Sequence, residues 1–236
     1  MAMLKSAAVT LLLVTPLVLT TGCDHNDDDD DDTSTTRASY EIKVTNLTTA
    51  QPLSPLAVVL HGNDYQMWQT GASASAGLEK LAEGGDNTDL LTEAADPQNV
   101  TMSGSGVIGP GASETLIVEA EPSTELKLSF ASMLVNTNDA FTGLRGEMIG
   151  GLTSGETKNL NIIAYDAGTE VNSESASSIP GPAAGGEGFN AARDDRDSVG
   201  GHPGVVSSND GLSGSALSEV HRFDNPVANV VITRIQ

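Results

Sequence analysis

The chain has 236 residues, and its 32 acidic side chains against 11 basic ones give a formal charge of −21. This charge excludes nucleic acid and an anionic bilayer surface as electrostatic partners, because both attract basic faces. It favours a cationic partner such as calcium. The length fits one domain or two. With 25 glycines, 10 prolines and only 3 % aromatic residues, the composition favours short strands and frequent turns over long helices.

The amino-terminal segment has the pattern of an export signal. Lys5 gives a positive start, and the apolar stretch from Ala7 to Thr20 is shorter than the roughly 20 residues that a membrane span needs. The segment ends in Leu-Thr-Thr-Gly-Cys, which resembles a bacterial lipoprotein signal. We expect a signal peptide over residues 1–22, cleavage before Cys23 and a lipid anchor on this cysteine. Secretion without a lipid is the alternative.

Residues 23–38 contain the aspartate run Asp27 to Asp32, followed by Thr and Ser. Adjacent like charges repel and no apolar group is available for burial, which predicts an extended, solvated tether. The alternative, a calcium-collecting run, lacks a glycine turn that would shape the carboxylates into a cage. Cys23 is the only cysteine, so an intramolecular disulfide is excluded.

The remaining residues 39–236 predict one all-β domain. Tyr40 to Thr45 alternates apolar and polar side chains, which is typical of a half-buried strand, and Ala57 to Leu60 is a short apolar run. Further strands are expected at residues 116–120, 126–135, 160–165 and 228–235, with weaker ones at 100–102, 107–108 and 144–148. Together they predict an antiparallel β-sandwich of about eight strands.

One helix is expected from Ala76 to Glu83, with Ser75 as its cap and two glycines after it. From Ser173 to Leu217 the chain is rich in Gly, Ser and Asp and has no apolar period. A segment of this length exceeds an ordinary connection, so we expect it to be functional or mobile.

Several sequence patterns do not support an enzyme. Gly104-x-Gly106-x-x-Gly109 precedes Pro110 and not a helix, which a dinucleotide site requires. An EF-hand beginning at Asp195 would have Val206 as its twelfth residue. No serine lies in G-x-S-x-G, and His25, His61, His202 and His221 lack zinc-site spacing.

Two segments carry more information. One runs from Ser132 to Leu144 and holds Asp139 in a polar loop; the other ends in Tyr165-Asp166-Ala167-Gly168-Thr169-Glu170. With the opening residues 40–48 and the closing residues 226–235, they resemble the spondin domain, the amino-terminal sandwich module of F-spondin and related matrix proteins.

The resemblance implies an eight-stranded antiparallel sandwich with a calcium ion held by Asp139, Asp166 and Glu170. Loop carboxylates suit this hard cation, which takes six to eight oxygen ligands. Gly168 can bend the chain so that the last two acids converge, and without an ion the three acids would raise one another's pKa. The alternative is that Asp139 and Asp166 only stabilise turns.

We therefore expect an exported, lipid-anchored, calcium-binding β-sandwich for adhesion or protein and matrix interaction at the bacterial cell envelope, and no catalysis. Its partner would be an envelope or extracellular protein or a glycan. Two alternatives remain open. A glycan-active envelope enzyme would use the long loop 173–217 with Asp194, Asp195, Asp197, His202 and the nearby His221. A carbohydrate-binding sandwich would use Trp68 for stacking.

Overall fold

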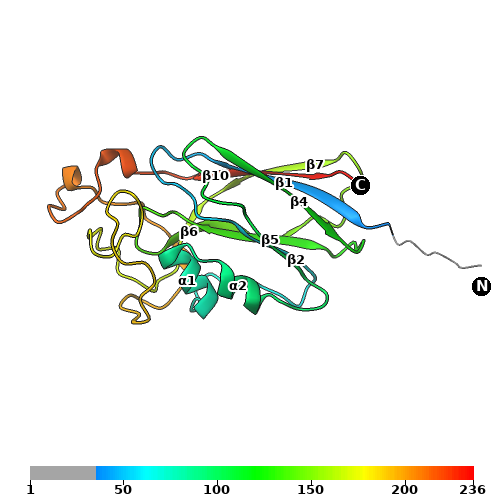
Figure 1. Cartoon of the computed structure of the whole chain (residues 1–236), viewed down its shortest axis with the longest axis horizontal. Coiled ribbons are helices and arrows are strands. Elements are labelled where there is room, and N and C mark those ends of the chain that lie inside the picture. The colour runs from blue at the N-terminus through cyan, green and yellow to red at the C-terminus, as the bar shows by residue number, and fades with distance from the viewer. Residues whose placement is uncertain (1–35) are drawn as a thin grey trace, which may run out of the picture. The chain divides into compact units, whose positions relative to one another are not determined.

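The computed structural model describes residues 36–236, which form two antiparallel β-sheets packed face to face (Figure 1). The strands of the first sheet lie in the order β4 (Ser113–Ala120), β1 (Ala38–Asn46), β10 (Ala228–Arg234) and β7 (Thr157–Ile162). Those of the second lie in the order β3 (Val100–Ser103), β2 (Ala57–His61), β5 (Lys127–Met133), β6 (Ala140–Met148), β8 (Ala164–Asp166) and β9 (Gly200–Gly201). The predicted all-β sandwich is confirmed, with ten strands in this part of the chain. The expected signal peptide, Cys23 and the acidic run lie outside the described residues.

The alternating pattern of β1 places one set of its side chains between the sheets. Tyr40, Ile42 and Val44 are buried there, whereas Lys43 faces solvent. β1 pairs with β10 on one side and with β4 on the other, so the first and last strands of the domain are neighbours. The inner faces of both sheets share one apolar core.

Two helices add a third layer on the outer face of the second sheet: α1 (Ala76–Gly84) and α2 (Thr88–Glu93). This layer explains why β2 has no polar alternation, because a strand covered on both faces reads as a continuous apolar run. Val58 and Leu60 of β2 enter the core between the sheets, and Ala57 and Val59 pack in the helix-side core.

The caps of α1 are those that the sequence predicts. Ser75 accepts a hydrogen bond from the Leu78 N–H at 3.1 Å, and Gly85 ends the helix in the left-handed conformation at φ 71°. The expectation of one helix was wrong, because α2 also forms. Its six residues are too few to show a helical period, and Asn87 gives it no side-chain cap. Burial of Leu90 supplies the missing stabilisation.

Ser75 joins the start of α1 to the end of α2, because its hydroxyl also donates to Glu93 Oε2 at 2.6 Å. We expect Ser75→Ala to lower the free energy of unfolding by about 1 kcal/mol, the usual cost of a lost helix cap. Urea denaturation measures this difference. Ser75→Asp, which keeps a cap acceptor but places a carboxylate against Glu93, should fall short of wild type. A Ser75→Ala midpoint equal to wild type would contradict the capping role.

Two expected strands differ from the structure. The run 160–165 is split, because β7 pairs with β10 in the first sheet while β8 pairs with β6 in the second. Ile163 is the crossing residue; its carbonyl accepts the Thr142 hydroxyl, and its side chain is exposed. Residues 107–108 form only an isolated bridge, between Ile108 and Leu53. The other expected strands coincide with or overlap observed ones.

The long loop 173–217 gathers at one end of the sandwich, opposite the end where β1 begins and the chain terminates (Figure 1). It includes β9 and a short 3-10 turn (Ser208–Asp210), and a second such turn (Glu219–His221) follows it. The loop is anchored by a small apolar cluster of Ile179, Val205 and Leu217, all buried. Among residues 36–236, no helix has the length and apolar character that crossing a membrane requires.

Candidate functional site

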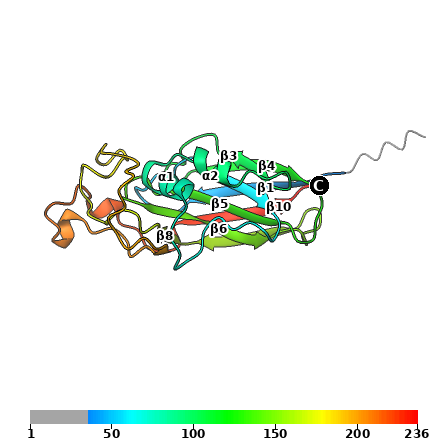
Figure 2. The ribbon, with the colours of Figure 1, turned by 90° about the horizontal axis from the view of Figure 1, so that it is seen from below.

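The pairing of β6 with β8 creates the site. Ala140 lies opposite Asp166 in the register, so Asp139, one residue before β6, is next to the carboxyl end of β8. The Ala167 N–H donates to the Asp139 carbonyl at 3.2 Å, and this hydrogen bond links the residue before β6 to the residue after β8. In Figure 2, β8 lies at the end of the sandwich where the long loop gathers. The two segments singled out in the sequence therefore meet at one place.

The turn after β8 depends on Gly168. Its φ is +71°, a left-handed conformation that favours glycine, and a Cβ there would lie 2.5 Å from the Ser198 carbonyl oxygen. The turn points the next two backbone N–H groups at the side chain of Asp139. Oδ2 of this acid accepts the Thr169 N–H at 2.8 Å and the Glu170 N–H at 3.2 Å.

Asp139 is fully buried, and its second oxygen, Oδ1, has no hydrogen-bond partner. Burial, with the charge of Asp166 as the next cause, raises the pKa of Asp139 to about 7, although the N–H donors at Oδ2 act to lower it. An unpaired carboxylate oxygen in this position is costly for the folded protein.

Glu170 also has an unpaired carboxylate oxygen. It is half-buried, and its Oε2 is a buried oxygen without a partner. Burial raises the pKa of Glu170 to about 7, and the charges of Glu83 and Asp139 act in the same direction, against hydrogen bonds from Asn138 and Ser178. The side chain of Glu170 is therefore close enough to Asp139 for the two charges to interact.

Asp166 is the satisfied member of the three. It is fully buried, and its Oδ1 accepts the Gly168 N–H at 2.8 Å and pairs with Arg196 Nη2 at 2.8 Å. Its Oδ2 accepts from Asn172 Nδ2 at 2.7 Å. His202 Nε2 lies 3.2 Å from Asn172 Oδ1, and burial lowers the pKa of this histidine to about 4, so it is neutral at pH 7.

Two acids of α1 extend the charged region toward the helix layer. Glu83 Oε2 accepts the Asn190 N–H at 2.8 Å, and Glu79 pairs with Arg193 at 2.7 Å. Burial raises the pKa of Glu83. Within residues 36–236 no group of three or more His, Cys, Asp or Glu side chains is arranged so that it could hold a metal ion.

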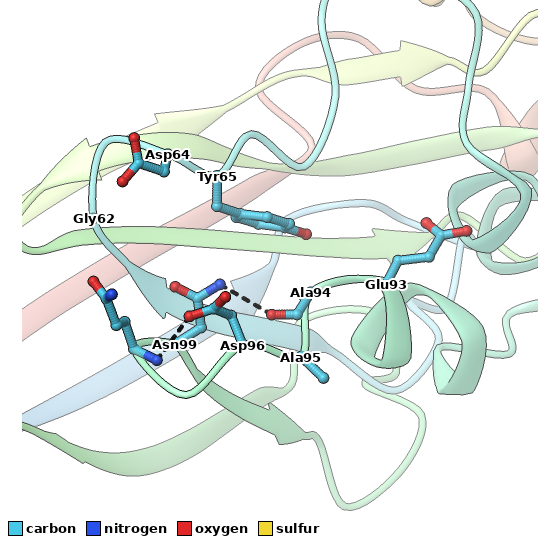
Figure 3. Close-up of a pocket in the computed structure, with 9 residues that line it drawn as sticks. Gly62, Asp64, Tyr65, Glu93, Ala94, Ala95, Asp96 and Asn99 are labelled. Atoms are coloured by element: carbon cyan, nitrogen blue, oxygen red, sulfur yellow. Dashed lines mark hydrogen bonds between the residues drawn. The ribbon is translucent and has the colours of Figure 1, made fainter.

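A separate hollow of about 250 Å³ lies beside β2 and α2 (Figure 3). It is lined by the acids Asp64, Glu93 and Asp96 and by Tyr65, whose pKa burial raises to about 12. Glu93 already has a hydrogen-bond partner in the protein, because its Oε1 accepts the Gly77 N–H at 2.7 Å. None of its lining side chains is a buried polar group without a partner, so the hollow lacks the feature that marks the site around Asp139.

The Spondin_N family model matches residues 42–183, more than half of the chain. The chain belongs to the Spondin_N family. No curated protein matches it. Spondin_N domains are extracellular modules for protein interaction and form a non-enzymatic family. The predicted resemblance is thereby confirmed. The sandwich of this Spondin_N domain continues past the matched residues, since β10 lies between β1 and β7.

The residues of the alternative functions have structural roles in this Spondin_N domain. Trp68 is only 5 % exposed and packs edge-on against Phe141, with ring centroids 5.1 Å apart, so it offers no stacking surface to a sugar. Among the loop residues of the enzyme alternative, Asp194 accepts a hydrogen bond from the Val171 N–H, and Asp197 forms an ion pair with Arg193. His221 accepts a hydrogen bond from the Ser218 N–H at 3.0 Å.

The loop residues around the three predicted acids were not among the predicted site residues. Arg196 and Asn172 contact Asp166, while Asn138 bonds Ser178 at 2.8 Å and accepts the Glu174 N–H. Only one signal pointed to Arg196: it is one of two basic residues in the acidic loop 173–217. Its partner is 30 positions away, and nothing in the local pattern identifies it.

Proposed function

We propose that this Spondin_N domain binds a calcium ion through Asp139, Asp166 and Glu170, and that the protein is a lipid-anchored interaction module at the bacterial cell envelope. One observation carries the calcium assignment. Two of the three acids, Asp139 and Glu170, are 31 residues apart in the sequence, and each has a buried oxygen without a partner. A hard divalent cation would ligate these oxygens and remove the cost of leaving them unpaired.

The charge balance around the site supports a cation. Five acids form a row in which, for each neighbouring pair, the charge of one acid raises the pKa of the other. The row runs from Glu79 through Glu83 and Glu170 to Asp139 and Asp166. Two guanidinium groups, of Arg193 and Arg196, pair with members of this row. With all five acids ionised, three negative charges remain, and a divalent ion would offset most of them. Calcium also accepts amide and backbone carbonyl oxygens, so the carboxylates need not fill the coordination shell.

Calcium titration by calorimetry tests this assignment. The full chain should bind calcium, and Asp139→Ala and Asp166→Ala should each weaken binding by at least about tenfold, because each removes a charged ligand. Asp64→Ala is the control, since it removes the same charge from an exposed position beside the hollow of Figure 3. Wild-type affinity in both site variants would overturn the assignment.

Cys23 is the proposed point of anchorage. β1 starts at the end of the sandwich opposite the loop 173–217, so a chain tethered through its amino-terminal side has the calcium site and this loop at its far end. That end is accessible to an envelope or extracellular protein or a glycan, which we propose as the partner. The observation favours presentation of the site away from the membrane.

Metabolic labelling with a fatty-acid analogue tests the anchor. The wild-type protein should carry label and fractionate with membranes, whereas Cys23→Ser should lose the label and be released, because a hydroxyl is not a substrate for thioether formation and no second cysteine exists. Equal labelling of the two proteins would place the lipid elsewhere, and an unlabelled wild type would favour plain secretion.

A further inference from the structure

Arg196 occupies the cation position at Asp166. Its Nη2 lies 2.8 Å from Oδ1 of an acid with no exposed side-chain surface, although the arginine side chain itself is 46 % exposed. The guanidinium is held in place by its own Nε, which donates to the Ser198 carbonyl at 2.9 Å. A Cβ at Gly200 would lie 2.8 Å from Nη2, so the absence of a side chain there makes room for the guanidinium.

The backbone that carries Arg196 is fastened to the turn of the site. The Asp194 N–H donates to the Thr169 carbonyl at 3.1 Å, and the Asp197 N–H donates to the Gly168 carbonyl at 2.7 Å. Gly200 pairs with Asp166 as β9 against β8. These contacts involve main-chain groups, so the arginine side chain can turn toward solvent without releasing the segment that bears it.

Both oxygens of Asp166 already have partners, Oδ1 in Arg196 and Oδ2 in Asn172, so a metal ion that ligates this acid would repel the guanidinium at short range. Arginine brings one positive charge and only donors, so it neutralises Asp166 but reaches neither Asp139 Oδ1 nor Glu170 Oε2, which stay unpaired. A divalent ion shared by the three acids would lie a few ångströms from a like charge. Nearly half of the arginine side chain already contacts water, which lowers the cost of its withdrawal.

We propose that the guanidinium of Arg196 competes with calcium for Asp166. It neutralises this acid in the metal-free protein and moves into solvent when the ion binds. This inference rests on the proposed function. It makes Arg196 a residue that sets calcium affinity, so that the site fills only where the ion is abundant enough to displace the arginine.

The test is calcium titration of the full-length wild type, Arg196→Gln, Arg196→Lys and Arg193→Gln by calorimetry. Arg196→Gln should bind calcium about tenfold more tightly than wild type, because calcium then does not have to break the ion pair between Arg196 and Asp166, and two opposite charges at 2.8 Å are worth about that factor even at the dielectric of water. Arg196→Lys keeps the charge and should stay within a few-fold of wild type. Arg193→Gln is the control for net charge, since Arg193 pairs with Glu79 and Asp197 and not with the three acids.

A second readout is the melting temperature in chelator, where Arg196→Gln should be below wild type, because Asp166 then lacks its counter-charge. Wild-type affinity in Arg196→Gln, or an equal gain in Arg193→Gln, would overturn the competition while leaving the calcium site intact. Binding by Arg196→Gln alone would support the competition and refute calcium binding by the wild type. If none of the four proteins binds calcium, both the calcium site and the competition by Arg196 are refuted.

Discussion

Calcium is expected to raise the melting temperature of the full chain by about 5–10 °C at a concentration one hundred times the dissociation constant. A ligand that binds only the folded state at that excess stabilises it by about 2.7 kcal/mol. For a domain of this size, 1 kcal/mol corresponds to roughly 2–4 °C. The physical source is the pair of unpartnered oxygens on Asp139 and Glu170, which are unpaired in the metal-free protein. Differential scanning calorimetry with calcium and with chelator measures the shift.

The calcium shift should grow as the pH rises from 5 to 8. The pKa values of Asp139 and Glu170 in the folded, metal-free protein are both raised to about 7, above those of the unfolded chain. Between about pH 4 and pH 7 the folded state therefore binds more protons than the unfolded state, and the stability that these groups contribute falls with rising pH. Bound calcium replaces those protons, so the metal-loaded protein lacks this loss.

Asp139→Asn is the matched control. The amide oxygen can still accept the Thr169 and Glu170 N–H groups, and an NH₂ replaces the unpaired oxygen, so the metal-free fold is retained. The variant should melt no lower than wild type in chelator and should respond little to calcium at any pH. A pH-independent calcium shift, or a full shift in this variant, would contradict the role given to Asp139.

Phe141→Ala should cost about 3–5 kcal/mol of unfolding free energy, the usual range for deleting a buried phenylalanine ring. Phe141 has no exposed surface, and its ring stacks on Tyr165 with centroids 5.4 Å apart and contacts Trp68 edge-on. This trio joins β6 and β8 beside the site, so its loss leaves a cavity between the sheet and the helix layer. The melting temperature should fall by roughly 6–20 °C.

Two comparisons identify packing as the cause. Phe141→Leu keeps most of the buried volume and should lose less than half as much stability. Val220→Ala removes apolar atoms from a side chain that is 55 % exposed, and it should be nearly neutral. Urea denaturation of the three variants gives the ranking. A Phe141→Ala cost below about 1 kcal/mol would show that the ring is not a structural element of this core.

The amino-acid sequence by itself determined the elements whose signals are local. The alternation at Tyr40, Ile42 and Val44 predicts β1, and Ser75 with Gly85 marks the ends of α1, because side-chain period and capping chemistry act within a few residues. The turn that carries Asp166, Gly168 and Glu170 is also visible as a motif. These signals, together with the family resemblance, sufficed for the fold class and for the three acids to be named.

Only the tertiary structure decided what surrounds those acids. The split of the run 160–165 between two sheets and the ion pair between Asp166 and Arg196 arise from partners far away in the sequence, and the helix α2 depends on packing against α1 and β2. Pairing and burial depend on which segments the topology brings together, and local residue patterns do not encode such contacts. Whether a carboxylate oxygen is paired or left alone is therefore a property of the folded chain.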